Sequence, residues 1–221
     1  ESTPVAITPD KRDIFVTANV AEGEVYTVSS VKVTGDTILP LEDIKKMVVL
    51  QEGMVFSRAL VELTSDGIIA TLGNIGYAFA QVNPVPEIDR ENRKIGINFF
   101  VEPGPRVQVR RISFVGNSTT ADEVLRREMR QFEGAWFSQA AIDRSKIRLQ
   151  RLGYFKTVDI TTPRVAGSDD QVDVLVKVEE QSSGAFQFGL GYSQLQGLLT
   201  SISVTQRNFL GTGNSVGVTL Q

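Results

Sequence analysis

An internal repeat constrains this chain most, because the same pattern of residues occurs twice along it. At an offset of 81 residues, Gly35 matches Gly116 and Gly53 matches Gly134. Further along, the offset shortens by about one helical turn, and Gly76 then matches Gly153. Self-similarity at a fixed period indicates one structural unit used more than once. The sequence therefore predicts two complete copies of one small fold.

Each copy starts with an alternating apolar segment, which is typical of a β-strand, and continues with two helical segments. In the second copy, residues 120–123 (TADE) form a capping-box pattern that predicts the start of the first helix. The apolar stripe predicted for that helix is Leu125, Met129 and Phe132. We expect the first helices to end at Gly53 and Gly134, and the second helices to be capped by Ser57 and Ser138 and to stop at Gly76 and Gly153.

Two further alternating segments complete each copy, over residues 78–85 and 94–102 in the first and 155–164 and 172–180 in the second. The order β-α-α-β-β predicts an α+β fold with a three-stranded mixed sheet and two helices on one face. The first strand lies parallel to the last through a right-handed crossover. The middle segment then lies at a sheet edge.

The repeat predicts the domain boundaries. Residues 1–24 look like the C-terminal tail of a preceding copy, 25–104 are the first complete copy and 105–181 the second. Residues 182–221 differ in composition, because Arg207 is the only charged residue among them. We expect the chain to be a piece of a longer protein.

The last 40 residues alternate with a period of two. Phe186, Phe188, Leu190 and Tyr192 point to one face, and small or polar residues point to the other. The pattern favours strands of a membrane β-barrel over a soluble β-meander, because soluble strands usually carry charge outside. Three such strands are too few to close a barrel. We expect them to be disordered or to pair with a partner, and their removal to leave the two repeats folded.

Composition argues against several kinds of function. The chain has no Cys and no His, which excludes a thiol nucleophile, a Ser-His-Asp triad and a Cys/His zinc site. The formal net charge of −3 argues against nucleic acid as a partner. We interpret the neighbouring Glu179 and Glu180 as a solvated strand end, since adjacent strand residues face opposite sides. No catalytic residue, metal site or cofactor is predicted.

Several segments carry a resemblance to a known family. The GYF sequence at 153–155 and the alternating strand ending at Glu180 resemble the POTRA domain. The segments at 127–137 (REMRQFEGAWF), 151–160 (RLGYFKTVDI) and 208–213 (NFLGTG) are similar to POTRA-containing outer-membrane proteins that assemble β-barrels. The resemblance covers nearly the whole chain and implies the end of a third POTRA domain, a fourth, a fifth and the first barrel strands.

The resemblance implies a non-enzymatic function in the Gram-negative outer membrane, with the POTRA domains in the periplasm. Such domains dock accessory outer-membrane lipoproteins and receive unfolded outer-membrane proteins, and the barrel opens laterally at its first strand, here residues 185–193. Alternatives are a POTRA-barrel transporter of two-partner secretion, a TamA-type protein, a patatin-like lipase fusion and a soluble repeat scaffold. The number of repeats upstream would discriminate among them.

Charged residues on the first helix of the second copy distinguish it from the first copy. Arg127 and Arg130 stand where the first copy has Lys46 and Val49, whereas Glu133 has a counterpart in Glu52. The resemblance implies that this helix end docks a lipoprotein. We therefore expect Glu133, Arg130 and Arg127 to bind it through charge, although Glu133 could instead serve only the local turn.

The middle strand of the second copy is the other predicted binding element. An exposed strand edge can pair with an extended chain without reading its sequence. Pro84 and Pro86 guard this edge in the first copy. The second copy has no proline over residues 157–162, so Thr157, Val158, Asp159, Ile160 and Thr161 are candidates for pairing with unfolded clients, while a guarded edge remains the alternative.

Overall fold

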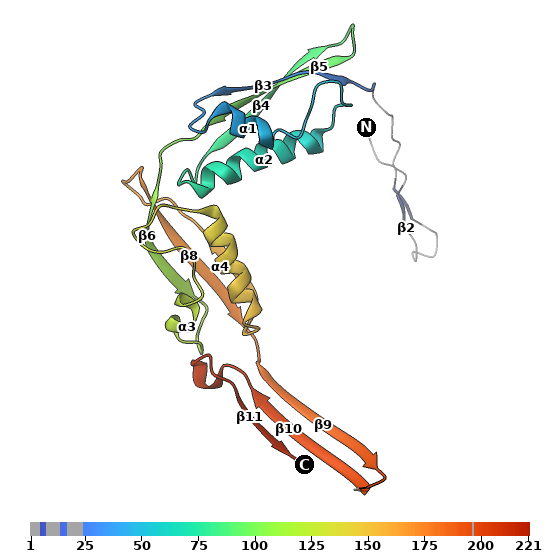
Figure 1. Ribbon diagram of the computed structural model, residues 1–221, viewed down its shortest axis with the longest axis vertical. Helices are drawn as coiled ribbons and strands as arrows, with labels where there is room; N and C mark the ends of the chain where they lie inside the picture. Colours follow the sequence, from blue (N-terminus) through green and yellow to red (C-terminus); the bar gives the residue numbers. More distant parts are fainter. Residues whose placement is uncertain (1–4, 8–13, 17–23, 196) are drawn as a thin grey trace.

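The computed structural model describes residues 5–7, 14–16, 24–195 and 197–221, and it contains two β-α-α-β-β units followed by a separate sheet (Figure 1). In the first unit, strand β3 (Thr27–Gly35) leads into helices α1 (Leu41–Met47) and α2 (Arg58–Asn74), and then into β4 (Gln81–Asp89) and β5 (Lys94–Glu102). The second unit consists of β6 (Gln108–Val115), α3 (Asp122–Arg126), α4 (Gln139–Arg151), β7 (Phe155–Thr161) and β8 (Gln171–Glu180).

The two sheets have the predicted topology. Their orders are β3-β5-β4 and β6-β8-β7, with the first and last strands parallel and the middle strand of the sequence at an edge. Both first strands carry a bulge at the same place, between Val28 and Ser30 and between Val109 and Arg111. The α+β prediction and the repeat are therefore confirmed.

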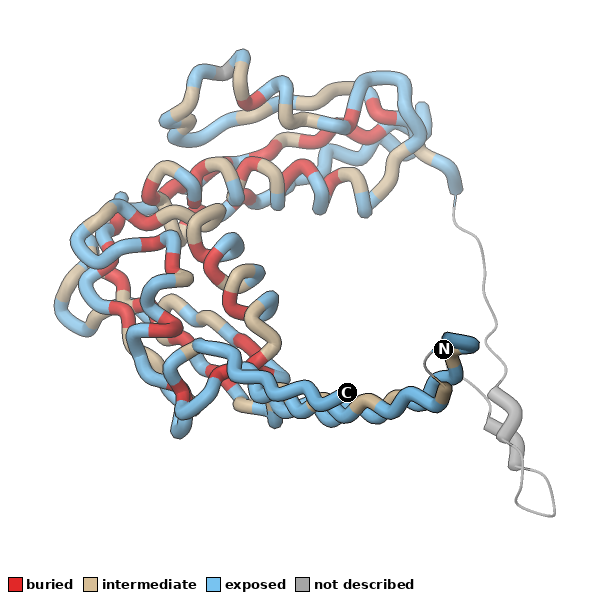
Figure 2. The backbone as a smooth tube through the Cα atoms, turned by 60° about the horizontal axis from the view of Figure 1, so that its bottom comes forward, coloured by how far each residue is buried: buried red, intermediate tan, exposed pale blue. Residues whose placement is uncertain are grey.

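The buried residues form a separate hydrophobic core in each unit, between the sheet and its helices (Figure 2). Phe99 and Leu72 are fully buried in the first core, and Leu125, Leu149 and Val174 in the second. The shortened repeat offset reflects helix length, because α2 has 17 residues and α4 has 13. The first unit therefore contains about one extra helical turn.

The repeated glycines at the ends of the first strands are explained by close packing. Gly35 and Gly116 have φ angles of 97° and 94°, which non-glycine residues rarely adopt. A Cβ atom at either position would overlap the carbonyl oxygen of Val101 or Val178 on the neighbouring strand. These two glycines let the chain turn away while remaining against the sheet.

Three details of the predicted first helices are wrong. The helices end at Met47 and Arg126, well before Gly53 and Gly134, because the chain then alternates between buried and exposed residues. Ala121 is the N-cap of α3 and no side chain caps it; the Thr120 hydroxyl instead accepts a hydrogen bond from Asn208. Phe132, predicted to be core, is 64% exposed because it lies in the irregular segment beyond the end of α3.

Boundaries elsewhere differ less. Pro40 is the N-cap of α1, and β4 spans Gln81–Asp89 where residues 78–85 were expected. The Ser138 hydroxyl accepts a bond from the Ala141 amide as predicted, whereas Ser57 occupies the N-cap of α2 without a side-chain bond. The predicted tail of a preceding copy, residues 1–24, lies mostly outside the described residues; β1 (Val5–Ile7) and β2 (Ile14–Val16) pair antiparallel.

A short connection fixes the second unit against the first. The Val107 amide donates to the Gly76 carbonyl (2.8 Å), and Arg106 Nε donates to the Ile75 carbonyl (2.8 Å). The Asn74 side chain accepts from the Ala140 amide (2.7 Å) at the start of α4. These bonds join the C-terminal end of α2 to the connection between the units and to the start of α4.

The last strands form their own sheet in the order β11-β10-β9, comprising β9 (Gly184–Ser193), β10 (Gly197–Gln206) and β11 (Val216–Leu220). It extends away from the second unit as a ribbon (Figure 1). These strands pair with one another and are therefore not disordered, while pairing of the open edges of the sheet with another copy stays a prediction. Among the residues whose positions are given, no helix is both long and apolar enough to cross a membrane.

Candidate functional site

The segment that follows α3, residues 127–133, exposes a mixed charged and aromatic surface. Met129 and Gln131 point inward, and the Arg130 amide donates to the hydroxyl of Ser145 on α4 (2.8 Å). The Gln131 amide group donates to the Trp136 carbonyl (3.0 Å), and its oxygen accepts from the Ser138 amide (2.9 Å). These anchors fix the irregular backbone beyond α3, and Arg130 and Phe132, which flank the buried Gln131, face solvent.

Arg130, Phe132 and Glu133 of this segment are exposed, and the exposed Trp136 follows shortly after it. Exposed aromatic and Arg side chains are enriched among the residues that dominate binding at protein interfaces. The sequence prediction selected the charged residues of this surface but placed Phe132 in the core and did not consider Trp136. The surface therefore combines charged and aromatic side chains, which suits a protein partner better than the charged residues alone would.

Glu133 has a structural contact that the sequence did not reveal. Its Oε1 atom accepts a hydrogen bond from the Ile112 amide on β6 (2.8 Å) and another from Arg126 Nη1 (3.3 Å). The Ile112 bond and then the charge of Arg126 lower the pKa of Glu133. Its expected position at a helix C-terminus is wrong, because α3 ends at Arg126. The carboxylate is thus ionised and oriented by the strand.

The structure does not join the three predicted residues into one ionic cluster. Arg126, which the prediction omitted, is the residue that pairs with Glu133. Arg127 Nε lies 3.8 Å from Glu128 Oε1, and the Arg127 guanidinium packs against Gly213 in the connection between β10 and β11. Arg130 Nη1 donates to the Met129 carbonyl. Arg127 therefore belongs to a different contact from Glu133.

The predicted β7 edge is present but carries charged groups. Val158 is buried and Ile160 half-buried, while Thr157, Asp159 and Thr161 are exposed. Lys146 lies 3.8 Å from Asp159, and Lys156 pairs with Glu179 (3.3 Å). Charge is one means by which proteins protect sheet edges from pairing, so client pairing at β7 stays a prediction.

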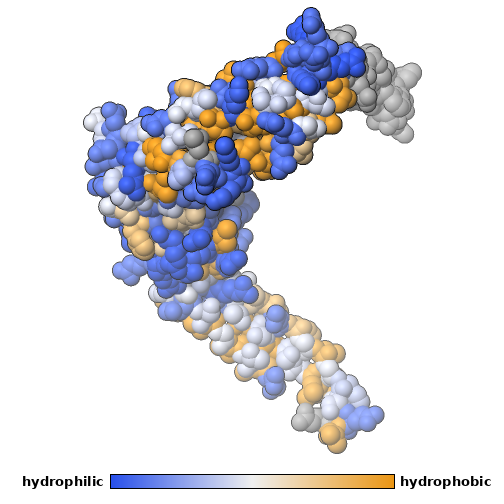
Figure 3. Space-filling view, turned by 45° about the horizontal axis from the view of Figure 1, so that its top comes forward, coloured by the Kyte–Doolittle hydropathy of each residue, from blue (hydrophilic) through white to orange (hydrophobic). Residues whose placement is uncertain are grey.

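The C-terminal sheet has one apolar face that no other layer of the described structure covers. Phe186, Phe188, Leu190 and Tyr192 are between 60% and 79% exposed. Their cross-strand neighbours on β10 include Val204, Ile202 and Leu198. In Figure 3 this ribbon is pale and orange, whereas the adjoining unit is largely hydrophilic. Apolar faces of this extent mark contact with a membrane or with another protein.

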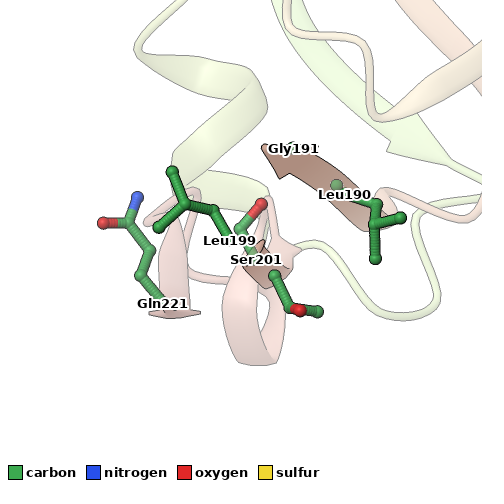
Figure 4. Close-up of a pocket in the computed structure, with 7 residues that line it drawn as sticks. Leu190, Gly191, Leu199, Ser201 and Gln221 are labelled. Carbon is green, nitrogen blue, oxygen red and sulfur yellow. The ribbon is translucent and has the colours of Figure 1, made fainter. Parts of the chain in front are cut away.

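Small residues on β9 leave a hollow of about 360 Å³ in the same ribbon, lined by Gly189, Gly191 and Ser201 among others (Figure 4). The described residues around it include no ionisable side chain. Within the described ranges, no three acidic side chains gather in a way that could hold a metal ion. The described lining of the hollow therefore offers no ionisable side chain for acid–base catalysis or metal binding.

The connection between β10 and β11 docks on the second unit, and the sequence did not predict this. Asn208, which is buried, donates from Nδ2 to the Thr120 hydroxyl (2.8 Å). The Ala121 amide donates to the Gly211 carbonyl, and the Tyr154 hydroxyl donates to the Gly213 carbonyl, each at 3.0 Å. Gly211 has a φ of 73°, and a Cβ there would overlap the Thr119 carbonyl oxygen. The NFLGTG segment is thus a docking loop.

Glu180 organises the loop that receives this segment. Its carboxylate accepts bonds from the amides of Thr120 (2.7 Å) and Thr119 (2.9 Å) and from the Ser118 hydroxyl (2.9 Å). Burial by itself would raise the pKa of Glu180, but the bonds from Thr120, Thr119 and Ser118 outweigh it and lower the pKa to about 2. The interpretation of Glu180 as a solvated strand end is therefore wrong, because three donors converge on it.

Tandem β-α-α-β-β units followed by a three-stranded ribbon with an exposed apolar face define a repeat protein. The sequence profile described as "Surface antigen variable number repeat", the POTRA family, matches residues 26–104 and 107–181. The chain belongs to the POTRA family.

The relatives are outer-membrane assembly factors. The chain is 31% identical over 217 residues to the outer membrane protein assembly factor BamA of Neisseria meningitidis serogroup B, covering 98% of this chain and 27% of the relative. A structure of Haemophilus ducreyi BamA lacking POTRA domains 1–3 is 39% identical, with a TM-score of 0.77, and 88% of this chain and 37% of that one are covered.

Haemophilus influenzae BamA POTRA domains 3–5 are 36% identical, with a TM-score of 0.75, covering 81% of this chain and 71% of that structure. The chain spans about a quarter to a third of the length of the curated BamA relatives that it matches.

Proposed function

We propose that this chain is the membrane-proximal part of a BamA-type outer-membrane protein assembly factor. In this proposal, residues 25–104 and 105–181 are the fourth and fifth POTRA domains, residues 1–24 end the third, and residues 182–221 are the first strands of the barrel. The POTRA domains lie in the periplasm, receive unfolded outer-membrane proteins and deliver them to a barrel that opens along β9. One observation carries the proposal: two POTRA repeats lead directly into a ribbon whose apolar face is uncovered in the described structure.

The second POTRA domain docks an accessory lipoprotein, foremost one of the BamD type, through the surface around Glu133 and Arg130. Support comes from the fixed, ionised carboxylate of Glu133 and from the exposed Phe132 and Trp136 beside it. Close charge pairs at protein interfaces can couple by about 1.5–7 kcal/mol. Arg127 lies against Gly213 and contributes indirectly, by supporting the junction with the C-terminal sheet.

The test uses Glu133→Gln, because the amide oxygen can still accept from the Ile112 amide while the charge is lost. We expect the affinity for the purified lipoprotein to fall by tenfold or more, with an unchanged melting temperature. A complementary charge change on the lipoprotein should rescue the reversed variant Glu133→Lys. Glu52→Gln in the first copy is the matched control and should leave binding unchanged. Equal binding by wild type and Glu133→Gln would show that Glu133 only supports β6.

A further inference from the structure

A cation and an aromatic ring meet where the second repeat joins the first. The guanidinium of Arg106 lies over the indole ring of Trp136, with Cζ 4.1 Å from the ring centroid. Arg106 belongs to the connection between β5 and β6, whereas Trp136 lies between α3 and α4. At the offset of 81 residues, the first copy has Val25 and Val55 in these two positions. The pair therefore distinguishes the second copy from the first.

The backbone around this pair is the same in both copies, so the difference lies in the side chains. Gln108 forms an antiparallel bridge with Trp136, and Thr27 forms the equivalent bridge with Val55. The Trp136 carbonyl also accepts a hydrogen bond from the Gln131 side chain (3.0 Å). These bonds hold the main chain but leave the indole ring, which is 45% exposed, to be oriented by a side-chain contact.

Arg106 is itself held by the first repeat. Its Nε donates to the carbonyl of Ile75, the C-cap residue of α2 (2.8 Å). Helix α2 has no basic residue in its last turn, so Arg106 supplies the positive charge that the carbonyl end of a helix favours. Gly76 leaves room for this contact, because a Cβ atom there would lie 2.7 Å from Arg106 Cγ. The guanidinium thus links the end of α2 to Trp136.

We infer that Arg106 is a positioning residue for Trp136, through which the first repeat shapes the lipoprotein-docking surface of the second. A cation over an indole ring is attracted to its π face, so the ring is oriented before the partner arrives. Ordering side chains is part of the cost of binding, and a side chain that is already ordered lowers this cost. The inference rests on the proposed docking function and adds the connection between the repeats to it.

Figure 1 shows the arrangement that this dependence requires, since the C-terminal end of α2 lies beside the start of α4. The Ala140 amide donates to the Asn74 side chain there (2.7 Å), which brings the end of α2 close to the segment that carries Trp136. A second cation lies over a ring between the same two units, because Arg164 Cζ is 3.9 Å from the centroid of Phe79. This second contact joins the units without involving Trp136, so it provides a matched control.

The first test uses fluorescence, because Trp136 is the only tryptophan in the full 221-residue chain. Its emission anisotropy and its quenching by acrylamide are measured in wild type and in Arg106→Ala, without the lipoprotein. We expect Arg106→Ala to show lower anisotropy and stronger quenching, because the ring loses the contact that orients it. Arg164→Ala should leave both signals unchanged, and melting temperatures show whether each variant is folded.

The second test measures the affinity for the purified lipoprotein. Arg106→Ala should bind about two- to tenfold more weakly, which is the scale of ordering one side chain on binding. In a Trp136→Ala background the same change should have no further effect, because Arg106 acts through the ring. Arg164→Ala should bind as wild type does.

Each outcome separates this inference from the docking proposal. Equal fluorescence of wild type and Arg106→Ala overturns the inference, whatever the lipoprotein does. Equal affinity of these two proteins, with binding weakened in Glu133→Gln, overturns it and leaves the docking function standing. An undiminished effect of Arg106→Ala in the Trp136→Ala background also overturns it, since Arg106 would then act on the partner directly. Absence of binding by wild type overturns the proposed docking, and the docking step of this inference with it.

Discussion

Replacing Glu180 with Gln tests how the second POTRA domain is joined to the C-terminal sheet. The amide oxygen could still accept from the Thr120 amide, but the NH2 group would take the place of Oε2 and face the N–H donor of Thr119. A pKa lowered from 4.5 to about 2 corresponds to at most about 3 kcal/mol at 1.36 kcal/mol per unit. The carboxylate is only partly buried, so solvent screening reduces this to about 1–2 kcal/mol.

The assay is thermal unfolding between pH 7 and pH 2, with Glu179→Gln as the neighbouring control. At pH 7 we expect Glu180→Gln to melt roughly 2–8 °C lower than wild type, using about 2–4 °C per kcal/mol for a chain of this size. The folded-state pKa is depressed, so the stabilisation is present above pH 4.5 and is lost as the pH falls toward about 2. The two melting curves should converge there.

Glu179 is exposed, and within the described part of the chain its carboxylate accepts hydrogen bonds from Lys156 and Thr157 alone, each at 3.3 Å. Its replacement should therefore change the free energy of unfolding by less than about 0.5 kcal/mol. Hydrogen exchange at the Ala121 amide, which donates to Gly211, should quicken in Glu180→Gln alone. A difference between wild type and Glu180→Gln that does not depend on pH, or equal effects of the two variants, would refute the reasoning.

Two other predictions concern the C-terminal sheet. Deleting residues 182–221 should leave the POTRA pair folded but lower its melting temperature by several degrees, because Thr120, Ala121 and Tyr154 lose partners worth about 1 kcal/mol each; loss of the unfolding transition would show that the sheet belongs to their core. In the intact protein, a Cys at Phe188 paired with one on the last barrel strand should form a disulfide and stop client assembly, and normal growth with the crosslink formed would contradict a lateral seam at β9. The 221 residues of this chain contain no Cys that would compete.

Periodic features of the fold could be predicted from the sequence, because burial of one face imposes a regular spacing on the residues. The repeat, the β-α-α-β-β order, the extra turn of α2 and the sheet order all follow from such spacing. The end of α3 could not be predicted, because the apolar Met129 and Phe132 have a spacing that suits a helix, although only Met129 is buried in the segment that forms. Local patterns do not discriminate between the two when the apolar run is short.

The contacts of the candidate site residues depended on tertiary structure more than the order of helices and strands did. The sequence by itself identified Glu133 as a candidate binding residue and the C-terminal strands as apolar on one side. Only the tertiary structure decided that Glu133 orients on Ile112, that Glu180 holds the loop at Thr120, and that Asn208 docks on the same loop. Glu180 and Asn208 lie 60 and 88 residues from Thr120 along the chain. A hydrogen bond between residues so far apart has no local periodicity, so its partner is known only once the strands and the loop are packed together.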